Sequence, residues 1–265
     1  MQDYVKEFNK RLQSIDISKS TIEKFSDYLS LTAYSIAQPF YKSEELEEKY
    51  LNVARKYNKK DIDKFAKLFA ITVEALDNKM HDFLGLVFSS NDMGSSYKGQ
   101  FFTPYHVSKM MSEITGYNLK EELKQKNYIT LSEPCSGSGG MIIAFAQTVM
   151  EYGFNYQKKL YVEAIDIDEN CFKMAYIQLS LLGIPAKVIL GDTLAQKFKV
   201  SLYTPMFFIN NWYVKLQELN NEIETISEEV EDFIEVPQKI EIKERKLEDV
   251  IDAVQLGERI QLKLF

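Results

Sequence analysis

The stretch "SEPCSGSGGMII", Ser132 to Ile143, has three glycines within four residues, after a short apolar segment and before a helix-type apolar run. Glycines in a strand-to-helix turn let the backbone approach a bound ligand closely, and the N-terminus of the helix favours an anionic group. The turn therefore predicts a ligand site. Three classes of ligand use such turns: nucleotide phosphates, dinucleotides and methyl donors.

The residues after the glycines separate these classes. A phosphate-binding loop needs Lys followed by Ser or Thr, but Met141 and Ile142 stand there. A dinucleotide fingerprint needs glycines spaced GxGxxG and an acidic residue about 20 positions later, whereas the turn reads "GSGGMI" and the acidic residues that follow are Glu151 and Glu163. The phosphate loop is excluded, the dinucleotide fingerprint is weak, and a methyl-donor pocket is favoured.

The glycine turn is one of four motifs that resemble a known family. "EPCSGSGGM" resembles the "DPxCGSGG" turn of adenine-N6 DNA methyltransferases, especially the modification subunits of type I restriction-modification systems. Upstream, "GQFFTPYHVSKMM" is similar to "GQFYTPxxVxxxM" of that family. Downstream, "AIDIDENC" matches its second strand with an acidic end, and "LGDTL" matches its "GDxL". The four motifs keep the family's order over roughly residues 83 to 195.

The resemblance implies S-adenosylmethionine as the cofactor. Gly137 and Gly139 would let the turn pass the methionine part, whose carboxylate would meet the helix N-terminus and the Thr103 hydroxyl. Asp166 would accept hydrogen bonds from both ribose hydroxyls, because a carboxylate is an acceptor only. The candidate cofactor-binding residues are Thr103, Pro104, Glu133, Cys135, Ser136, Gly137, Gly139, Asp166, Ile167 and Asp192.

Two of these residues are expected to hold the adenine ring. Ile167 would cover one face of the ring, and Asp192 would accept a hydrogen bond from its exocyclic amine. The alternative is structural: Asp166 and Asp168 could merely end a strand and cap a helix, as Asp often does. The ordered motifs favour cofactor binding.

The catalytic motif departs from the family. An adenine-N6 methyltransferase carries "NPPY" or "NPPF" after its fourth strand, where Asn and a prolyl carbonyl accept the hydrogens of the target amine and the aromatic stacks on the flipped base. Here "NNWY", Asn210 to Tyr213, keeps an Asn and an aromatic without either proline. Asn210 and Tyr213 are the candidate catalytic residues. Trp212 and Tyr213 could equally begin a packed helix.

The cysteines predict no metal site. Cys135 and Cys171 are too few for a disulfide framework or a four-ligand zinc site, so both are expected to be reduced thiols. A nucleophilic Cys135 would need a His base, and neither His81 nor His106 forms a recognisable arrangement with it. We therefore expect Cys135 to be a packed thiol.

The apolar periodicity divides the chain into three parts. Residues 1–92 predict helices: "STIEKFSDYLSLTAYSIA" opens with a capping box, and an apolar stripe runs from Asp61 to about Phe88. Residues 93–213 alternate strands and helices, with strands at "YITLSEP", "LYVEAIDID", "AKVILGD" and "YTPMFFIN". We therefore expect an α/β fold, a Rossmann-like methyltransferase sheet behind an N-terminal helical domain. Residues 214–265 form an acidic segment.

Charge and hydropathy bound the function. The net charge is −7, and Glu218 to Asp252 carry 13 acidic and 4 basic residues, or −9, which leaves +2 elsewhere. The basic stretch Arg55 to Lys67 could contact phosphates, although a solvated helix face is favoured. No apolar run is long enough to cross a membrane and the start lacks a signal-peptide pattern, so we expect a cytoplasmic protein.

Two functions from different classes remain open. The first is an adenine-N6 DNA methyltransferase in which a partner, such as a specificity subunit, recognises DNA, because only about 50 residues follow the last motif. The second is a donor-binding module without catalysis, such as a regulatory or anti-restriction protein of a mobile element.

The final residues, "QLKLF", suggest a partner of another kind. Gln261, Leu262, Leu264 and Phe265 resemble the peptide with which bacterial replication and repair proteins dock into the sliding clamp. The alternation of "RIQLKLF" is also typical of an edge strand, and chance is a third explanation.

Overall fold

The computed structural model describes residues 1–91, 93, 102–218 and 262–263. Five helices come first: α1 (Gln2–Gln13), α2 (Thr21–Tyr41), α3 (Glu44–Ala54), α4 (Lys59–Asn78) and α5 (Phe83–Ser90). The predicted cap of α2 is present, since the Ser20 hydroxyl accepts from the Glu23 amide at 3.2 Å. The stripe predicted between Asp61 and Phe88 is divided between α4 and α5, because Asp82 caps a new helix by accepting from the Gly85 amide.

The second part builds a five-stranded sheet in the order β4-β3-β2-β1-β5. Its strands are β1 (Ile129–Glu133), β2 (Leu160–Asp166), β3 (Ala186–Asp192), β4 (Lys197–Tyr203) and β5 (Leu262–Lys263). The helices are α6 (Tyr105–Thr115), α7 (Leu119–Gln125), α8 (Gly140–Glu151), α9 (Tyr156–Lys159), α10 (Glu169–Leu181) and α11 (Pro205–Ile209). Strands β5, β1, β2 and β3 run parallel. The predicted α/β fold with an N-terminal helical region is confirmed.

The fourth strand differs from the prediction. β4 turns back antiparallel to β3, and "PMFFI", expected inside a strand, forms helix α11. Pro205 stands at the first turn of α11, where its fixed φ suits a helix and its missing amide costs nothing. The end of β4 therefore lies at the edge of the sheet where β3 begins.

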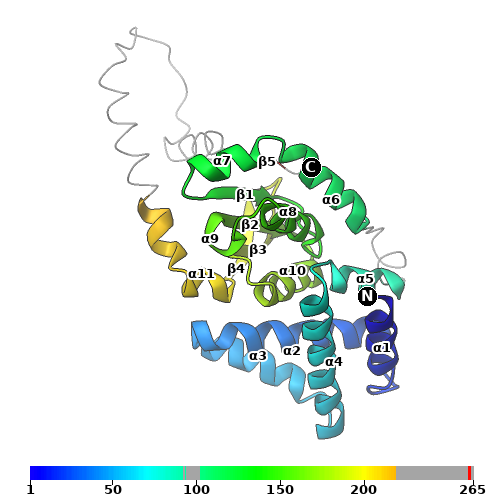
Figure 1. Ribbon diagram of the computed structural model, residues 1–265. Coiled ribbons are helices and arrows are strands. Elements are labelled where there is room, and N and C mark those ends of the chain that lie inside the picture. Colours follow the sequence, from blue (N-terminus) through cyan, green and yellow to red (C-terminus); the bar gives the residue numbers. More distant parts are fainter. Residues whose placement is uncertain (92, 94–101, 219–261, 264–265) are drawn as a thin grey trace.

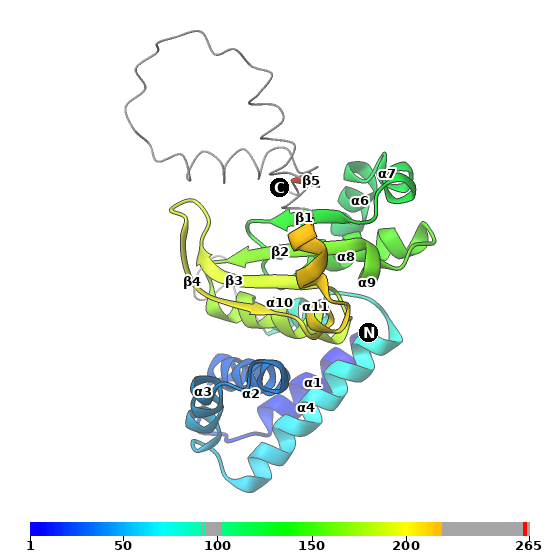
Figure 2. The same ribbon diagram turned by 90° about the vertical axis from the view of Figure 1, so that its left-hand side faces the viewer.

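The helical region packs directly on the sheet region (Figures 1 and 2). Helix α10 covers β2 and β3 and contacts α2 and α5 on its other side. One hydrophobic cluster joins Phe25 and Phe83 of the helices to Val162 and Val188 of the strands. The division of the chain at residues 92 and 93 stays a prediction, and the core crosses it.

Most of the acidic segment lies outside the described residues, as do Gln261, Leu264 and Phe265. The backbone of Leu262 and Lys263 forms β5, which pairs in parallel with Leu131 and Ser132 of β1. This pairing favours the edge-strand interpretation of "QLKLF", and nothing in the structure supports docking into a sliding clamp.

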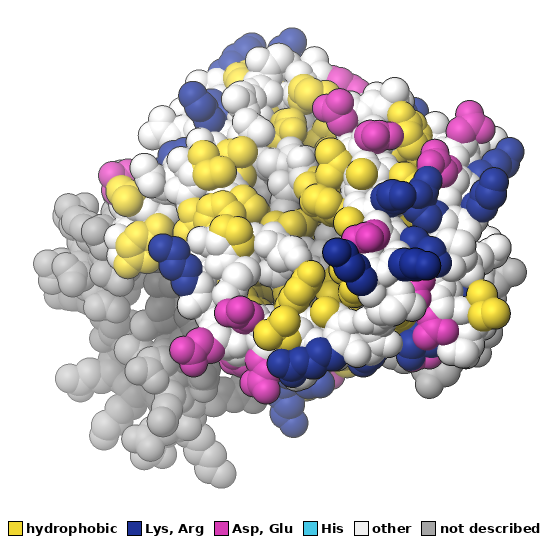
Figure 3. All heavy atoms as spheres, turned by 90° about the horizontal axis from the view of Figure 1, so that it is seen from below, with side chains coloured by type: hydrophobic (Ala, Val, Ile, Leu, Met, Phe, Trp, Pro, Cys, Tyr) yellow, Lys and Arg dark blue, Asp and Glu magenta, His cyan; other side chains and the backbone are white. Residues whose placement is uncertain are grey.

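The face seen from below carries interspersed basic and acidic side chains (Figure 3), and two lysines of the basic stretch Arg55 to Lys67 form ion pairs. Lys56 pairs with Asp27 at 3.1 Å and Lys64 pairs with Asp61 at 2.8 Å. These pairs favour a solvated helix face over a phosphate-binding surface. No described helix is both long and apolar enough to span a membrane.

Candidate functional site

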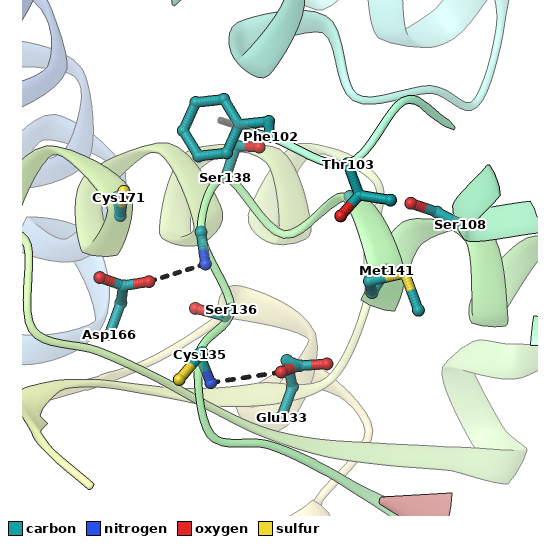
Figure 4. Close-up of a pocket in the computed structure, with 12 residues that line it drawn as sticks. Phe102, Thr103, Ser108, Glu133, Cys135, Ser136, Ser138, Met141, Asp166 and Cys171 are labelled. Carbon is teal, nitrogen blue, oxygen red and sulfur yellow. Dashed lines mark hydrogen bonds between the residues drawn. The ribbon is translucent and has the colours of Figure 1, made fainter. Parts of the chain in front are cut away.

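A cavity of about 210 Å³ lies at the carboxyl ends of β1 and β2 (Figure 4). Its wall includes six of the predicted cofactor-binding residues: Thr103, Glu133, Cys135, Ser136, Gly137 and Asp166. The wall also contains Phe102, Ser108, Ser138, Gly140, Met141 and Cys171. The structure thus brings together residues from the α6 segment, the glycine turn and β2, as the ordered motifs predict.

Two glycines of the turn adopt left-handed backbone conformations. Gly137 has φ +54° and Gly139 has φ +93°, which disfavour any residue with a Cβ atom. The Ser136 amide donates to the Ile165 carbonyl and the Gly139 amide donates to the Ser136 carbonyl, both at 2.8 Å. The turn is therefore held against the end of β2 and delivers the chain to the first residue of α8.

Gly139→Ala is expected to lower the free energy of unfolding by about 1–2 kcal/mol because alanine is strained at a positive φ. Space is not the obstacle, since a Cβ at this position would lie 3.5 Å from its nearest neighbour, Ala175. Urea denaturation measures the loss. Gly153→Ala is the matched control: it has φ +88° and lies in open space away from the cavity. Both variants should lose stability, and only Gly139→Ala should also lose ligand affinity.

Asp166 ends β2 and faces the glycine turn. One carboxylate oxygen accepts from the Gly137 amide and the other from the Asp168 amide, both at 2.8 Å. Burial raises the pKa of Asp166 above its usual value, and these two hydrogen bonds oppose the rise. The carboxylate keeps lone pairs for a ligand, since each oxygen can accept two hydrogen bonds. Asp168 caps α10, as the structural alternative predicts, so the two aspartates have different roles.

Glu133 lies on the other side of the turn, at the end of β1. Its Oε1 accepts from the Cys135 amide at 3.2 Å, whereas Oε2 is buried without a hydrogen-bond partner among the described residues. The side chain is 3% exposed, and this burial raises its pKa to about 7, with a further rise from the nearby Asp166 charge. A buried carboxylate without a counter-ion is unfavourable, so the site suits a cationic ligand group.

Besides Ser138, three residues contribute hydroxyls to the cavity wall: Thr103, Ser108 and Ser136. The Ser108 and Ser136 hydroxyls are buried, and neither has a partner in the described part of the chain. Thr103 is exposed at the mouth of the cavity. Ser108 was not among the predicted site residues. It lies one helical turn after Pro104, near the start of α6, and its side chain faces the cavity (Figure 4).

The other predicted residues lie around the cavity rather than in its wall. Ile167 follows Asp166 and is 66% exposed, which leaves its apolar side chain open to a planar ring. Asp192 ends β3 at the same edge of the sheet, and one oxygen caps the amides of Leu194 and Ala195 at 3.0 Å. Pro104 precedes α6 as its cap residue.

Cys135 differs from the expectation of a packed thiol. It is exposed and belongs to the cavity wall. Partial burial and the carboxylates of Asp166 and Glu133 raise its pKa, so the thiol is not activated as a nucleophile. No group of three or more His, Cys, Asp or Glu that could hold a metal ion occurs within the described ranges.

The structure does not bring Asn210 and Tyr213 to the cavity. The Asn210 side-chain amide donates to the carbonyl of Gln157 at 2.9 Å, and Gln157 lies just before β2. β2 is 7 residues long, so Asn210 and Asp166 are at opposite edges of the sheet, roughly 20 Å apart. Trp212 is fully buried against Tyr161 and Tyr128, which agrees with the packed-helix alternative.

The strand that precedes this region ends earlier than predicted. β4 ends at Tyr203, so the place for a motif after the fourth strand falls on "TPMF", Thr204 to Phe207. The Thr204 hydroxyl is fully buried and both accepts from the Ala186 amide and donates to the Ile184 carbonyl. Phe207 is buried against Tyr203. These residues are used in packing at the edge away from the cavity.

A model of the N-6 DNA methylase family matches residues 80–221, more than half of the chain. The chain belongs to the N-6 DNA methylase family. The match begins before α5 and ends beyond α11, so the family region includes the last helix of the N-terminal part. Membership implies S-adenosylmethionine as the cofactor, as the sequence motifs predict.

Several solved structures are similar to this N-6 DNA methylase chain. One, described as a class I S-adenosylmethionine-dependent methyltransferase of Listeria monocytogenes, is 14% identical with a TM-score of 0.37, covering 70% of this chain and 52% of the other. A type I restriction-modification methyltransferase subunit of Streptococcus thermophilus is 15% identical with a TM-score of 0.34, covering 69% and 56%. DrdV, in a complex with DNA, is 13% identical with a TM-score of 0.35, covering 69% and 20%.

The chain spans about half the length of the first two structures. Curated proteins gave no match. Membership of the N-6 DNA methylase family therefore rests on the family model.

The cavity fits the cofactor of this family. The unpartnered Glu133 oxygen can hold an ammonium group, and the Ser108 and Thr103 hydroxyls, with the N-terminus of α8, can receive a carboxylate. Asp166 and Ile167 stand side by side at the end of β2, where a nucleoside would need a hydroxyl acceptor and an apolar cover. The ammonium, carboxylate and ribose groups of S-adenosylmethionine each have a chemically matched partner.

Proposed function

We propose that this chain, a member of the N-6 DNA methylase family, binds S-adenosylmethionine in the cavity and does not transfer its methyl group to DNA on its own. One observation carries the proposal: Glu133 and Asp166 flank the glycine turn, and each keeps unused acceptor capacity toward the same cavity. When bound, the cofactor supplies an activated methyl group on a positively charged sulfur.

The chain's own residues bind and orient that ligand. Glu133 binds the ammonium group. The positive charge of that group stabilises the ionised form of the buried Glu133 carboxylate. Gly137 has no Cβ, so its backbone can approach the ligand closely. A Cβ at this position would lie 3.1 Å from the Phe102 ring. Asp166 accepts from the ribose hydroxyls while it stays tied to the turn, so ribose and methionine positions are fixed together.

The geometry favours donor binding without methyl transfer by this chain alone. The sequence contains no Asn-Pro-Pro-aromatic motif, and "TPMF" and "NNWY" both lie at the edge of the sheet away from the cavity. Neither segment can hold a target adenine beside the donor in this arrangement. We therefore place the chain with the regulatory, donor-binding alternative. The second candidate is a methyltransferase completed by a partner that supplies DNA specificity.

Titration calorimetry and a methyl-transfer assay on the chain alone test whether it binds the donor and whether it lacks methyl transfer without a partner. We expect S-adenosylmethionine and its demethylated product to bind, and no labelled methyl group to appear on adenine in mixed DNA. Asn210→Ala and Tyr213→Ala are expected to leave donor binding unchanged. Absence of binding would refute the pocket assignment. Methyl transfer by the chain alone that Asn210→Ala abolishes would restore the catalytic role predicted for "NNWY".

A further inference from the structure

A buried carboxylate outside the cavity wall contacts the glycine turn from the N-terminal helices. Asp82 caps α5 and is 5% exposed. Its Oδ2 accepts from the Ser138 hydroxyl at 2.6 Å, and its Oδ1 accepts from the Gln178 side-chain amide at 2.9 Å and from the Gly85 amide at 3.0 Å. Every one of these donors is neutral.

Gln178 of α10 closes the network on both sides. Its amide nitrogen also donates to the Ser138 carbonyl at 2.7 Å, and its oxygen accepts from the Leu84 amide at 2.9 Å. Ser138 is thus held through its hydroxyl by Asp82 and through its carbonyl by Gln178. Residues from α5, the turn and α10 share one set of buried hydrogen bonds, and such sets act as a unit.

Two glycines make room for the Asp82 carboxylate. A Cβ at Gly85 would lie 2.2 Å from Oδ2, and a Cβ at Gly140 would lie 2.9 Å from the same atom. Gly140 is the first residue of α8 and Gly85 lies in the first turn of α5, so the carboxylate sits at the N-termini of two helices. Glycine thus leaves space for the Asp82 carboxylate at both positions.

We propose that Asp82 is a positioning residue for the cofactor site, an inference that rests on the proposed function. Ser138 lies between Gly137 and Gly139, the two residues whose left-handed conformations shape the turn. Asp82 fixes Ser138 and so sets where the Gly137 amide and the N-terminus of α8 stand relative to Asp166. The N-terminal helices thereby determine cofactor affinity without touching the cofactor.

The test is calorimetry of the full chain with S-adenosylhomocysteine. Ser138→Ala and Asp82→Asn should each weaken binding about tenfold. The double variant should bind as well as the single variant with the lower affinity, because both substitutions remove the same Asp82–Ser138 hydrogen bond. Ser138→Ala carries the test if Asp82→Asn does not fold. Hydrogen exchange should show the Leu84 and Gly85 amides more protected when the ligand is bound.

Tyr28→Phe is the matched control for lost stability. It removes a buried hydroxyl that bonds to Thr72 at 2.6 Å inside the helical region, away from the turn. It should leave the affinity unchanged. A folded Ser138→Ala variant with wild-type affinity, additive losses in the double variant, or an equal loss in Tyr28→Phe would each overturn the positioning role. If the wild type does not bind, the proposed function fails, and the positioning role fails with it.

Discussion

Glu133→Gln should make the ligand-free protein more stable at pH 8, by up to about 3 kcal/mol. The pKa of Glu133 is about 7 in the folded protein against 4.5 for an ordinary Glu. Between these values the folded state keeps a proton that the unfolded state has released. Its stabilising effect is complete below pH 4.5 and is lost as the pH rises through 7. Glutamine imitates the protonated side chain, so it avoids this loss.

The same substitution should weaken ligand binding, because glutamine offers no charge to the ammonium group. Wild-type affinity for S-adenosylhomocysteine should fall as the pH drops through about 7, whereas the variant should show no such change. Urea unfolding at pH 5 and pH 8, with calorimetry at both, measures the two effects. Glu163→Gln on β2, outside the cavity wall, is the control and should change neither. A less stable variant at pH 8 that binds normally would contradict this account of Glu133.

Local motifs predicted the cofactor side of the fold. The glycine turn, the acidic end of β2 and the "GDTL" segment after β3 are each defined by neighbouring residues, so the sequence places them at strand ends without knowledge of the fold. Because parallel strands end at one edge of a sheet, these motifs must meet there. The structure brings Glu133, Gly137 and Asp166 to one cavity for this reason.

The fourth strand runs antiparallel to β3 because the connection between the two strands is short. The motif pattern contains no information about the length of that connection. Four residues, Thr193 to Gln196, join β3 to β4. A parallel crossover needs about a dozen residues or more, so the chain must turn back. The length of this connection depends on where β4 begins, and the sequence pattern placed that start at Tyr203 instead of Lys197. The reversal of the chain moves "TPMF" and "NNWY" to the edge opposite the cavity.

The Asp82 network could not be predicted from local patterns. Asp82, Ser138 and Gln178 are far apart in the chain, and each residue type is common at helix caps, turns or helix surfaces. Only their burial in one place shows that they act together. The apolar periodicity continues from α4 into α5, so the sequence pattern predicted one long stripe with Asp82 inside it. Asp82 is instead the N-cap of α5.

Asp166→Ala is expected to reduce the affinity for S-adenosylhomocysteine by at least about 100-fold. The substitution removes the acceptor for the ribose hydroxyls and also frees the Gly137 amide, which the carboxylate now holds at 2.8 Å. Hydrogen bonds to charged groups contribute about 1.5–3 kcal/mol each, and two of them correspond to a loss of roughly two orders of magnitude or more. Calorimetry on variants shown to be folded measures the change.

Asp168→Ala is the matched control for this prediction. Asp168 lies two residues away and accepts from the amides of Asn170 and Cys171 as the cap of α10, but it is not part of the cavity wall. Losing a cap should lower the free energy of unfolding by about 1 kcal/mol and leave the affinity within a few fold of wild type. Similar losses of affinity in both variants would mean that Asp166 acts through the stability of this region. Unchanged affinity in Asp166→Ala would show that the ribose does not bind at the end of β2.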